Sequence, residues 1–347
     1  VDIYGGFAGT ETAREQRDWI ANPSILDGQD ARRVVTAATA RFDGLHVIRG
    51  RCDTAGGMYA NGCAVIIANC VFTGNAGDVG GGLYCRNNDE IDIYNCVFYN
   101  NTAYCAHGSF NGKGAAIRMA DSSLSVRSCT FYNNNAAKAG GGLHMWGGSP
   151  RVVNCIFWEN GGGEIVVDGG STPTVSYCCV QGGYSGTGNI ERYPSFVDAP
   201  DNLRLLDDSP CLDAGDGDEA PGVDIEMNAR FDQSGVVNTG AGAVPYVDMG
   251  AFERQDQPYP GTMALSVDEF NVTGWRPADE TFEIWRSYGE NPVNYTIVSN
   301  QNWVQCSPSS GVSTGEHDLI TLRFDTSGLA VGTHQATLTV SAPNASN

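Results

Sequence analysis

The sequence has very little lysine and few cations of any kind. Lys113 and Lys138 are its only lysines, and 20 Lys and Arg residues stand against 40 Asp and Glu residues, for a formal net charge of −20. Binding to nucleic acid or to anionic lipid requires clustered cations that neutralise phosphate groups. We therefore expect neither as a partner, whereas an acidic surface suits a protein exposed to a saline exterior.

Long apolar runs and metal-binding cysteine spacings are also missing. No run of about 18 apolar residues occurs, so we expect no membrane span. The 12 cysteines include no CxxC pair, which argues against a structural zinc site. No signal peptide is visible, and Val1 lies in a segment typical of a strand.

Glycine, by contrast, is abundant. Its 45 copies follow no G-X-Y period, which excludes collagen. Glycines between short apolar runs indicate many tight turns and many short strands. The composition is thus typical of an all-β protein.

Two short motifs alternate along the first half of the chain. Four segments share a Cys-x-Phe unit closed by Asn, starting at residues 69, 95, 128 and 154, and a degenerate fifth starts at residue 177. A small-residue unit followed by Leu, Ile or Met recurs between them, starting at residues 56, 80, 114 and 140. The cysteines recur at steps of 26, 33, 26 and 23 residues, the length of one solenoid coil with two or three strands. The pattern predicts a parallel β-helix, with Tyr104 to Lys113 inserted as a projecting loop.

Stacked coils about 4.8 Å apart place like residues in columns. The expected structural ladders are Cys70, Cys96, Cys129, Cys155 and Cys178; Phe72, Phe98, Phe131 and Phe157; and Asn75, Asn101, Asn134 and Asn160. We expect the Cys column to be reduced, because parallel side chains rarely meet the disulfide dihedral. Better disulfide candidates are Cys52, Cys63, Cys105 and Cys211. The ladder asparagines are expected to occupy left-handed turns and to bond amide to amide.

Longer motifs carry a resemblance to secreted bacterial proteins. The repeat units resemble those of polymorphic outer-membrane proteins, and Ile3–Glu11 with Gln16–Trp19 resembles the start of many secreted bacterial β-helix proteins. Ser209–Asp216, Asn228–Arg230 and Val247–Glu253 are similar to the choice-of-anchor Q domain. These motifs span about residues 1–255. The resemblance implies a right-handed β-helix with a closing cap, on surface-exposed proteins without a general catalytic activity.

The chain is expected to hold two domains. We predict the β-helix over residues 1–254, with its cap at about 190–254, a polar Pro-rich linker at 255–262 and a second domain at 263–347. Short alternating strands in the last segment predict an immunoglobulin-like β-sandwich. Asn302–Val304, Ser307–Gly311 and Asp325–Thr333 resemble a BACON-type domain, which implies a spacer or carbohydrate-associated module. Related domains continue for another strand, so we expect an open sheet edge here.

One aromatic residue follows each of the last three ladder phenylalanines. Tyr99, Tyr132 and Trp158 are expected to face outward as one exposed column, with Tyr59 and Tyr84 as a shorter one. Sugar rings pack on flat aromatic faces, so one hypothesis is a carbohydrate platform. The alternatives are a column that stabilises neighbouring coils and a contact with another protomer.

The densest acidic cluster lies in the expected cap. It contains Asp213, Asp216, Asp218, Asp224 and Asp248, together with Glu226. Hard oxygen ligands at short spacing suit Ca²⁺, the only cofactor that the sequence suggests. No EF-hand order is present, and the alternative is that these side chains cap backbone N–H groups in turns.

A polysaccharide lyase is the enzymatic alternative, since some lyases are β-helices. Such chemistry needs a cation or Ca²⁺ and a basic residue that takes the α-proton. Arg118 and His144 are expected on equivalent strands one coil apart, with Lys113, Lys138 and Asp121 nearby. The acidic surface argues against polyuronate substrates, and no paired carboxylates suggest a glycosidase.

The sequence therefore predicts a non-enzymatic protein, secreted and located at the cell surface or outside the cell. Its role is expected to be structural or adhesive. Two open ends favour head-to-tail assembly into a homo-oligomer or filament. Extracellular glycans are the partners expected under the carbohydrate-binding alternative.

Overall fold

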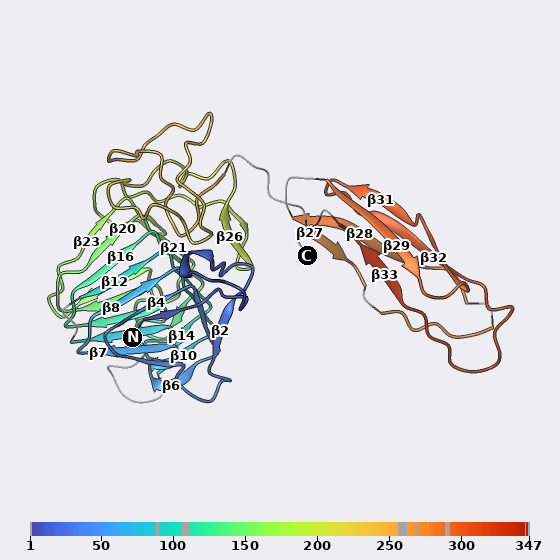
Figure 1. The fold of residues 1–347 in the computed structure, drawn as a ribbon, viewed down its shortest axis with the longest axis horizontal. Coiled ribbons are helices and arrows are strands. Elements are labelled where there is room, and N and C mark those ends of the chain that lie inside the picture. Colours follow the sequence, from blue (N-terminus) through green and yellow to red (C-terminus); the bar gives the residue numbers. More distant parts are fainter. Residues whose placement is uncertain are drawn as a thin grey trace. The chain divides into compact units, whose positions relative to one another are not determined.

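The computed structural model describes residues 2–87, 90–105, 112–255, 262–267, 269–275, 277–288, 292–343 and 345. The chain divides into two units, Val1–Asp256 and Gln257–Asn347 (Figure 1). The expected linker at 255–262 lies largely outside the described residues. Strands and turns build nearly all of the described structure, in which the one helical segment is a 3-10 turn at Arg14–Gln16. No helix in the described ranges is long and apolar enough to cross a membrane.

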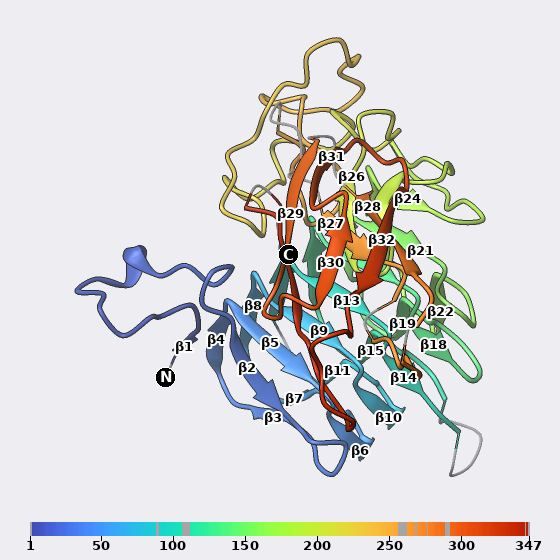
Figure 2. The same ribbon diagram turned by 90° about the vertical axis from the view of Figure 1, so that its right-hand side faces the viewer.

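The first unit is a parallel β-solenoid whose coils stack as rungs (Figure 2). Two of its four sheets have seven strands. Sheet A contains, in order, β1 (Ile3–Tyr4), β4 (Ala40–Asp43), β8 (Val65–Ala68), β12 (Ile91–Tyr94), β16 (Leu124–Arg127), β20 (Arg151–Val153) and β23 (Thr174–Ser176). Sheet B contains β2 (Ser24–Asp27), β5 (Leu45–Ile48), β9 (Val71–Thr73), β13 (Val97–Tyr99), β17 (Thr130–Tyr132), β21 (Ile156–Trp158) and β24 (Cys179–Val180).

Two further parallel sheets complete the coil. Sheet C contains β3 (Val35–Ala37), β7 (Met58–Asn61), β11 (Leu83–Arg86), β15 (Ile117–Ala120), β19 (Leu143–Trp146) and β22 (Ile165–Asp168). Sheet D contains β6 (Arg51–Thr54), β10 (Ala76–Val79), β14 (Thr102–Ala103) and β18 (Asn135–Ala136). Because alternate residues of each strand point into the coil, a single apolar core fills the solenoid. The predicted all-β solenoid is thus confirmed.

The predicted Phe and Asn ladders are present inside the coil. The rings of Phe72, Phe98, Phe131 and Phe157 stack with centroid separations of 4.7, 5.1 and 4.4 Å. The ladder asparagines bond from coil to coil, Asn75 Nδ2 to Asn101 Oδ1 at 3.0 Å and Asn101 Nδ2 to Asn134 Oδ1 at 2.9 Å. The predicted left-handed conformation is wrong by one position. It belongs to the residue before each ladder Asn, namely Gly74, Asn100, Asn133 and Glu159, with φ between 50 and 63°.

None of the 12 cysteines forms a disulfide, so the loop cysteines named as disulfide candidates are not bridged. The predicted column of reduced cysteines is present and buried: Cys70, Cys96, Cys129, Cys155 and Cys178. Within it, the backbone N–H of Cys70 donates to the sulfur of Cys96 at 3.4 Å, and Cys96 donates likewise to Cys129. The column therefore also serves as a line of hydrogen-bond acceptors.

A cap follows the last coil. It contains the hairpin β25 (Phe196–Asp198) and β26 (Asn202–Leu205) and then irregular chain to Arg254. A second apolar core joins the cap to the outer side of sheet B, through Phe196, Leu205, Leu212 and Met249.

The second unit consists of two antiparallel sheets packed around a common core. One sheet contains β27 (Thr262–Leu265), β28 (Glu280–Tyr288), β32 (Asp318–Phe324) and β30 (Val304–Ser307). The other contains β31 (Ser310–Ser313), β29 (Val293–Ser299) and β33 (Leu338–Ser341). Phe282, Ile284, Ile297 and Ile320 form the interior between them. The architecture is that of a β-sandwich, as the alternating pattern predicts.

Candidate functional site: an arginine-lined pocket

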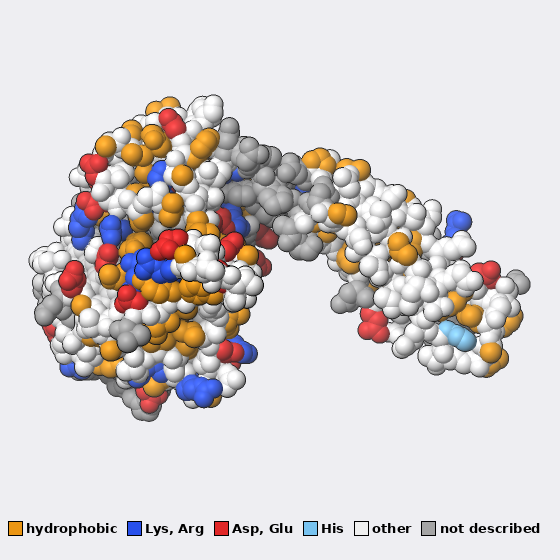
Figure 3. Space-filling model, in the orientation of Figure 1, with side chains coloured by type: hydrophobic (Ala, Val, Ile, Leu, Met, Phe, Trp, Pro, Cys, Tyr) orange, Lys and Arg blue, Asp and Glu red, His pale blue; other side chains and the backbone are white. Residues whose placement is uncertain are grey.

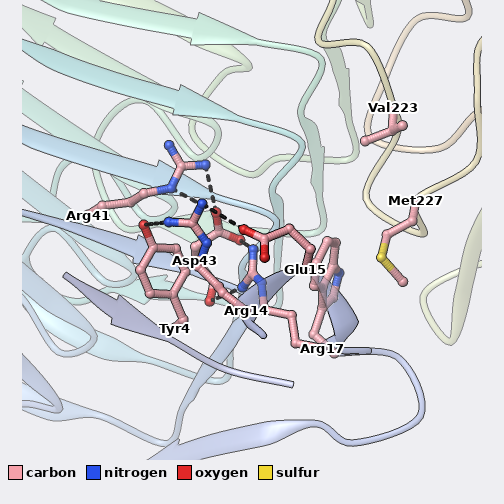
Figure 4. A pocket seen from close by; sticks show the side chains of 9 residues that line it. Tyr4, Arg14, Glu15, Arg17, Arg41, Asp43, Val223 and Met227 are labelled. Atoms are coloured by element: carbon pink, nitrogen blue, oxygen red, sulfur yellow. Dashed lines mark hydrogen bonds and ion pairs between the residues drawn. The ribbon is translucent and has the colours of Figure 1, made fainter. Parts of the chain in front are cut away.

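A pocket of about 540 Å³ opens on the outer side of sheet A (Figure 4). Three segments that are far apart in the sequence build it: the N-terminal segment, strand β4 and the cap loop at 223–227. The lining side chains are Tyr4, Arg14, Glu15, Arg17, Trp19, Arg41, Asp43, Val223 and Met227. Phe42 points into the core, so its strand neighbours Arg41 and Asp43 point outward to the pocket.

Asp43 forms the floor of the pocket and holds two arginines. Its Oδ1 accepts from Arg17 Nη2 at 2.7 Å and from Asn69 Nδ2 at 2.9 Å. Its Oδ2 accepts from Arg41 Nε and Nη2 at 2.8 and 2.6 Å. The side chain of Asp43 is 1% exposed, so the guanidinium groups cover the carboxylate. Burial opposes the charge of Arg41, but the bonds to Asp43 and Tyr94 outweigh it and raise the pKa of Arg41.

Aromatic rings fix the direction of the guanidinium groups. Arg17 lies between two rings, 4.9 Å from the centroid of Tyr4 and 4.6 Å from that of Trp19. Arg14 lies 5.0 Å from the centroid of Tyr4 and donates to the Tyr4 hydroxyl at 3.1 Å. Trp19 is itself anchored, because its Nε1 donates to the Ile225 carbonyl at 2.7 Å. Such stacking restricts side chains that would otherwise sample many rotamers.

The chemistry of the pocket is that of binding. Its lining contains no Ser, Cys or His, so it offers no nucleophile–base pair. Three arginines face two carboxylates, one of them buried at the floor. Figure 3 shows basic and acidic side chains side by side on one face of the first unit.

The predicted aromatic column is assembled but is not an exposed platform. Tyr99, Tyr132 and Trp158 are register partners in sheet B. However, the cap covers them: Tyr132 is 7% exposed and meets Phe196 edge to face at 5.6 Å, while Tyr193 covers Trp158 at 5.7 Å. The prediction that these rings face solvent is wrong for Tyr132, because the cap forms a second core over sheet B.

The shorter column, Tyr59 and Tyr84, lies on sheet C. The two ring centroids are 5.5 Å apart, Tyr59 is half-buried and Tyr84 is 9% exposed. Both residues belong to a small apolar cluster with Ala55, Val79 and Ala120. These contacts are those expected of a column that stabilises neighbouring coils.

The residues considered for lyase chemistry do meet, in a buried network beside Tyr84. Arg118 Nη1 lies 2.5 Å from His144 Nδ1, and His144 Nε2 lies 2.9 Å from Asp168 Oδ2, which also accepts from Lys113 Nζ at 2.8 Å. Because a guanidinium only donates, Nδ1 accepts and Nε2 carries the proton. His144 is fully buried and Arg118 is 7% exposed. Both ring nitrogens are therefore occupied, and no substrate reaches them in this conformation.

The electrostatics of this network keep His144 neutral. Burial, followed by the charges of Arg118 and Lys113, lowers the pKa of His144 to about 4 against the opposing effect of Asp168. Burial also lowers the pKa of Arg118, whose Nε has no hydrogen-bond partner in the described part of the chain. The network is consistent with a structural role on sheet C.

The acidic residues proposed for Ca²⁺ do not converge. Among the described residues, no group of three or more His, Cys, Asp or Glu side chains could hold a metal ion. Instead, they accept backbone N–H groups at separate turns: Asp216 from Asp218, Asp218 from Ala243, and Asp248 from Asp213 and Arg254. Asp224 accepts from the backbone N–H groups of Glu226, Asn228 and Glu253. The turn-capping alternative therefore accounts for Asp216, Asp218, Asp224 and Asp248. Glu226 instead pairs with Arg204.

Burial of two of these acids has an electrostatic consequence. It raises the pKa of Asp213 to about 6. It also raises the pKa of Asp248, and the nearby carboxylate of Glu253 adds to this effect. Glu253 pairs with Arg230 at 2.8 Å, which joins this interior of the cap to its surface. Buried hydrogen bonds and ion pairs of these acids thus connect segments of the cap.

Comparison with known proteins agrees with this geometry. Residues 20–150 and 105–188 match the model of the family described as the right handed beta helix region. These matches span just under half of the chain and cover the strands of the solenoid from β2 to β24. The class that the fold defines is therefore the right-handed parallel β-solenoid. A search of curated proteins finds no match to the chain.

The pocket itself was not anticipated from the sequence. The alternation in Arg41-Phe42-Asp43 could have indicated two outward charged residues on one strand. Nothing in the sequence, however, indicates that Arg14 and Arg17 meet them, or that the loop carrying Val223 and Met227 lies opposite. These contacts join segments separated by up to 200 residues or so, which local patterns do not report.

Proposed function

We propose that the protein is a rigid scaffold located at a cell surface or outside the cell. The observation that carries this proposal is the unbroken set of ladders along the solenoid. Stacked rings and bonded amides repeat on successive coils, from Phe72 to Phe157 and from Asn75 to Asn160. Structure of this kind resists bending and local opening, since each coil is bound to both neighbours.

Composition supports the location. A net charge of −20 with only two lysines is compatible with a saline exterior. The resemblances of the cap to the choice-of-anchor Q domain and of the second unit to a BACON-type domain point the same way. In this proposal the solenoid supplies the rigid body, and the sandwich is a spacer or attachment module.

Adhesion and self-assembly are finer parts of the proposal. Strands β1, β2 and β3 form one edge of sheets A, B and C, and their outer edges pair with no other described strand. Such edges can accept a strand from another copy, and a contact that does not close on itself builds a filament. Sedimentation velocity over a range of concentrations tests this part, because assembly predicts a rising sedimentation coefficient and a monomer predicts a constant one.

The location is tested on cells that produce the protein. Antibodies against the first unit should label intact cells or the culture medium, and external protease should remove the signal. A cytoplasmic marker protein, assayed in the same samples, controls for lysis. Labelling that appears only after the cells are opened would contradict the proposal.

The carbohydrate alternative is not favoured in its original form. The cap buries Tyr132, and Tyr193 packs edge to face against the half-buried Trp158, so these rings do not form one exposed flat face for a sugar. Lyase chemistry through Arg118 and His144 meets the same objection, since both side chains are buried.

A further inference from the structure

The arginine-lined pocket has the features of a ligand site, and the scaffold role does not use it. Its volume of about 540 Å³ lies within the range of about 300–1,000 Å³ that small-molecule sites occupy. Its walls combine guanidinium groups with exposed apolar side chains, Val223 and Met227, each 39% exposed. Figure 4 shows the arginines on one side and these two residues on the facing loop.

The charge balance leaves the pocket one cation in excess. Among its lining residues, Arg14, Arg17 and Arg41 face only Asp43 and Glu15. Asp43 is shared by two arginines and lies beneath them, so an entering ligand meets guanidinium groups first. Glu15 is 72% exposed and pairs with Arg14 at the rim. An exposed pair of this kind contributes little to stability, so a ligand anion can replace Glu15.

Each of the three arginines has one nitrogen that makes no hydrogen bond to the described residues. In the described part of the chain, no hydrogen bond uses Nη1 of Arg41, and none uses Nε of Arg17 or of Arg14. The side chain of Arg41 is 26% exposed and lines the pocket. When a ligand anion replaces Glu15, Nε and Nη2 of Arg14 become a two-donor edge that matches a carboxylate, which can accept two parallel hydrogen bonds. Nη1 of Arg41 supplies a further single donor.

The arginines are also preorganised for binding. Arg17 is held between Tyr4 and Trp19, and Arg41 is tied to Asp43 and to the Tyr94 hydroxyl. Met227 adopts a left-handed backbone conformation with φ of 66°, which is strained for a residue with a side chain. Side chains that are already ordered lose little entropy on binding.

We propose that this pocket binds a small ligand in which a carboxylate is attached to a ring. The carboxylate lies against the free donors of Arg14 and Arg41. The ring lies toward Met227 and Val223, which need an apolar or flat partner. In a chain of net charge −20, these clustered guanidinium groups favour entry of an anion that most of the surface would repel.

Isothermal titration calorimetry of the full chain with three probes tests the proposal. D-glucuronate has both ring and carboxylate, D-glucose has the ring alone and acetate the carboxylate alone. Glucuronate should bind, acetate should bind more weakly and glucose should give no saturable heat. Rising NaCl concentration should weaken the binding of glucuronate, because the contact is between charges. Binding of glucose as tight as that of glucuronate would overturn the proposal, as would no binding of either carboxylate at millimolar concentration.

Two variants locate the site. Arg14→Gln changes an exposed side chain and should weaken glucuronate binding about tenfold to a hundredfold, the usual effect of losing a charged hydrogen bond. The matched control is Arg49→Gln, since Arg49 is a similarly exposed arginine of the same unit that pairs with Asp27 outside the pocket. Equal loss in both variants, or in neither, would contradict the assignment.

A second readout does not depend on the arginines. In protein labelled with ¹³C at the methionine methyl groups, the Met227 signal should shift on addition of glucuronate and not of glucose. Met227→Leu identifies that signal among the six methionines. Binding by calorimetry without a shift at Met227 would place the ligand elsewhere and overturn the proposed site.

Discussion

Asn154 and Asp216, which are 62 residues apart in the sequence, exchange two hydrogen bonds. Asn154 Nδ2 donates to the Asp216 carbonyl at 2.8 Å, and the Asp216 backbone N–H donates to Asn154 Oδ1 at 2.7 Å. The Asn154 carbonyl also accepts from the Gly250 N–H at 2.8 Å. One residue of the coil therefore holds two separate stretches of the cap. The cap is joined to the solenoid by directed polar contacts as well as by the second apolar core.

Removal of a single acceptor on the coil should loosen the cap. The buried Thr130 Oγ1 accepts from the Ala251 N–H at 3.0 Å. Thr130→Val keeps the shape of the side chain but removes this acceptor, which leaves the Ala251 N–H unpaired. We expect a loss of about 1–3 kcal/mol in stability. In hydrogen exchange, the amides of residues 247–254 should lose more protection than those of sheet C.

The control for this variant is an exposed threonine on a strand of the same unit. Thr174→Val in β23 alters a side chain that forms no hydrogen bond with the described residues of the cap, and it should leave cap protection unchanged. Loss of protection spread evenly over all sheets in Thr130→Val would show that the cap does not open separately.

Replacement of a single asparagine in the Asn ladder should lower the stability of the solenoid strongly. Asn134 Oδ1 accepts from both the backbone N–H and the Nδ2 of Asn101, at 3.1 and 2.9 Å, and its own Nδ2 donates to the Phe98 carbonyl at 2.9 Å. Asn134→Ala leaves several buried groups unpaired, so unfolding free energy should fall by about 3 kcal/mol or more. Denaturant unfolding measures the change.

Asn61→Ala is the matched control for the ladder. Asn61 is exposed and accepts one long bond, from Asn87 Nδ2 at 3.3 Å. Its replacement should change stability by less than about 0.5 kcal/mol. If Asn134→Ala has an equally small effect, the amide ladder does not stabilise the solenoid.

The inside of the coil was predictable because its determinants are local and periodic. Each coil contributes one Cys, one Phe and one Asn at fixed spacing, and identical coils can only stack like on like. The turn conformation was predicted one residue too late. Both Asn100 and Asn101 are asparagines, and composition alone does not show which of them takes positive φ and which enters the ladder.

The outer face was predicted poorly because other segments decide its burial. Tyr132 is outward on its strand, yet the cap hairpin places Phe196 against it. The short sequence spacing of the cap acids is typical of metal ligands, but the chain path separates them. Asp218, Asp224 and Asp248 accept backbone N–H groups instead. The pocket also depends on contacts between segments far apart in the sequence. Only the strand alternation at Arg41 and Asp43 could have indicated it from the sequence.

The end of the Asn ladder should make stability depend on pH. Asn160 has no asparagine beyond it, and its backbone N–H and Nδ2 donate to the carboxyl of Glu164 instead, the first at 3.1 Å. Burial, with a minor contribution from Glu159, raises the pKa of Glu164 to about 7 despite these bonds. The folded state therefore binds this proton more tightly than the unfolded state, and stability falls as pH rises from about 4.5 to 7.

Glu164→Gln removes this dependence and keeps an acceptor for Asn160. The variant should equal the wild type near pH 5 and exceed it by about 2 kcal/mol at pH 8, measured by denaturant unfolding. Glu191→Gln, at an exposed site of the same unit, serves as the control. An advantage of Glu164→Gln that does not change with pH would show that Glu164 is not protonated in the folded protein.

His144 should make stability depend on pH in the opposite direction, so that stability falls on acidification. Its folded pKa of about 4 is below the ordinary value of 6.5, so the unfolded state binds the proton more tightly in this range. The stability that neutral His144 supports is complete above pH 6.5 and is lost as pH falls toward 4. His144→Gln can still bond to Arg118 and Asp168, and it should lose less stability than the wild type between pH 7 and pH 4.

His317→Gln, at an exposed site in the second unit, is the control for removal of a histidine. If His144→Gln and the wild type lose stability in parallel on acidification, His144 is charged in the folded state and the network with Arg118 must rearrange to hold it.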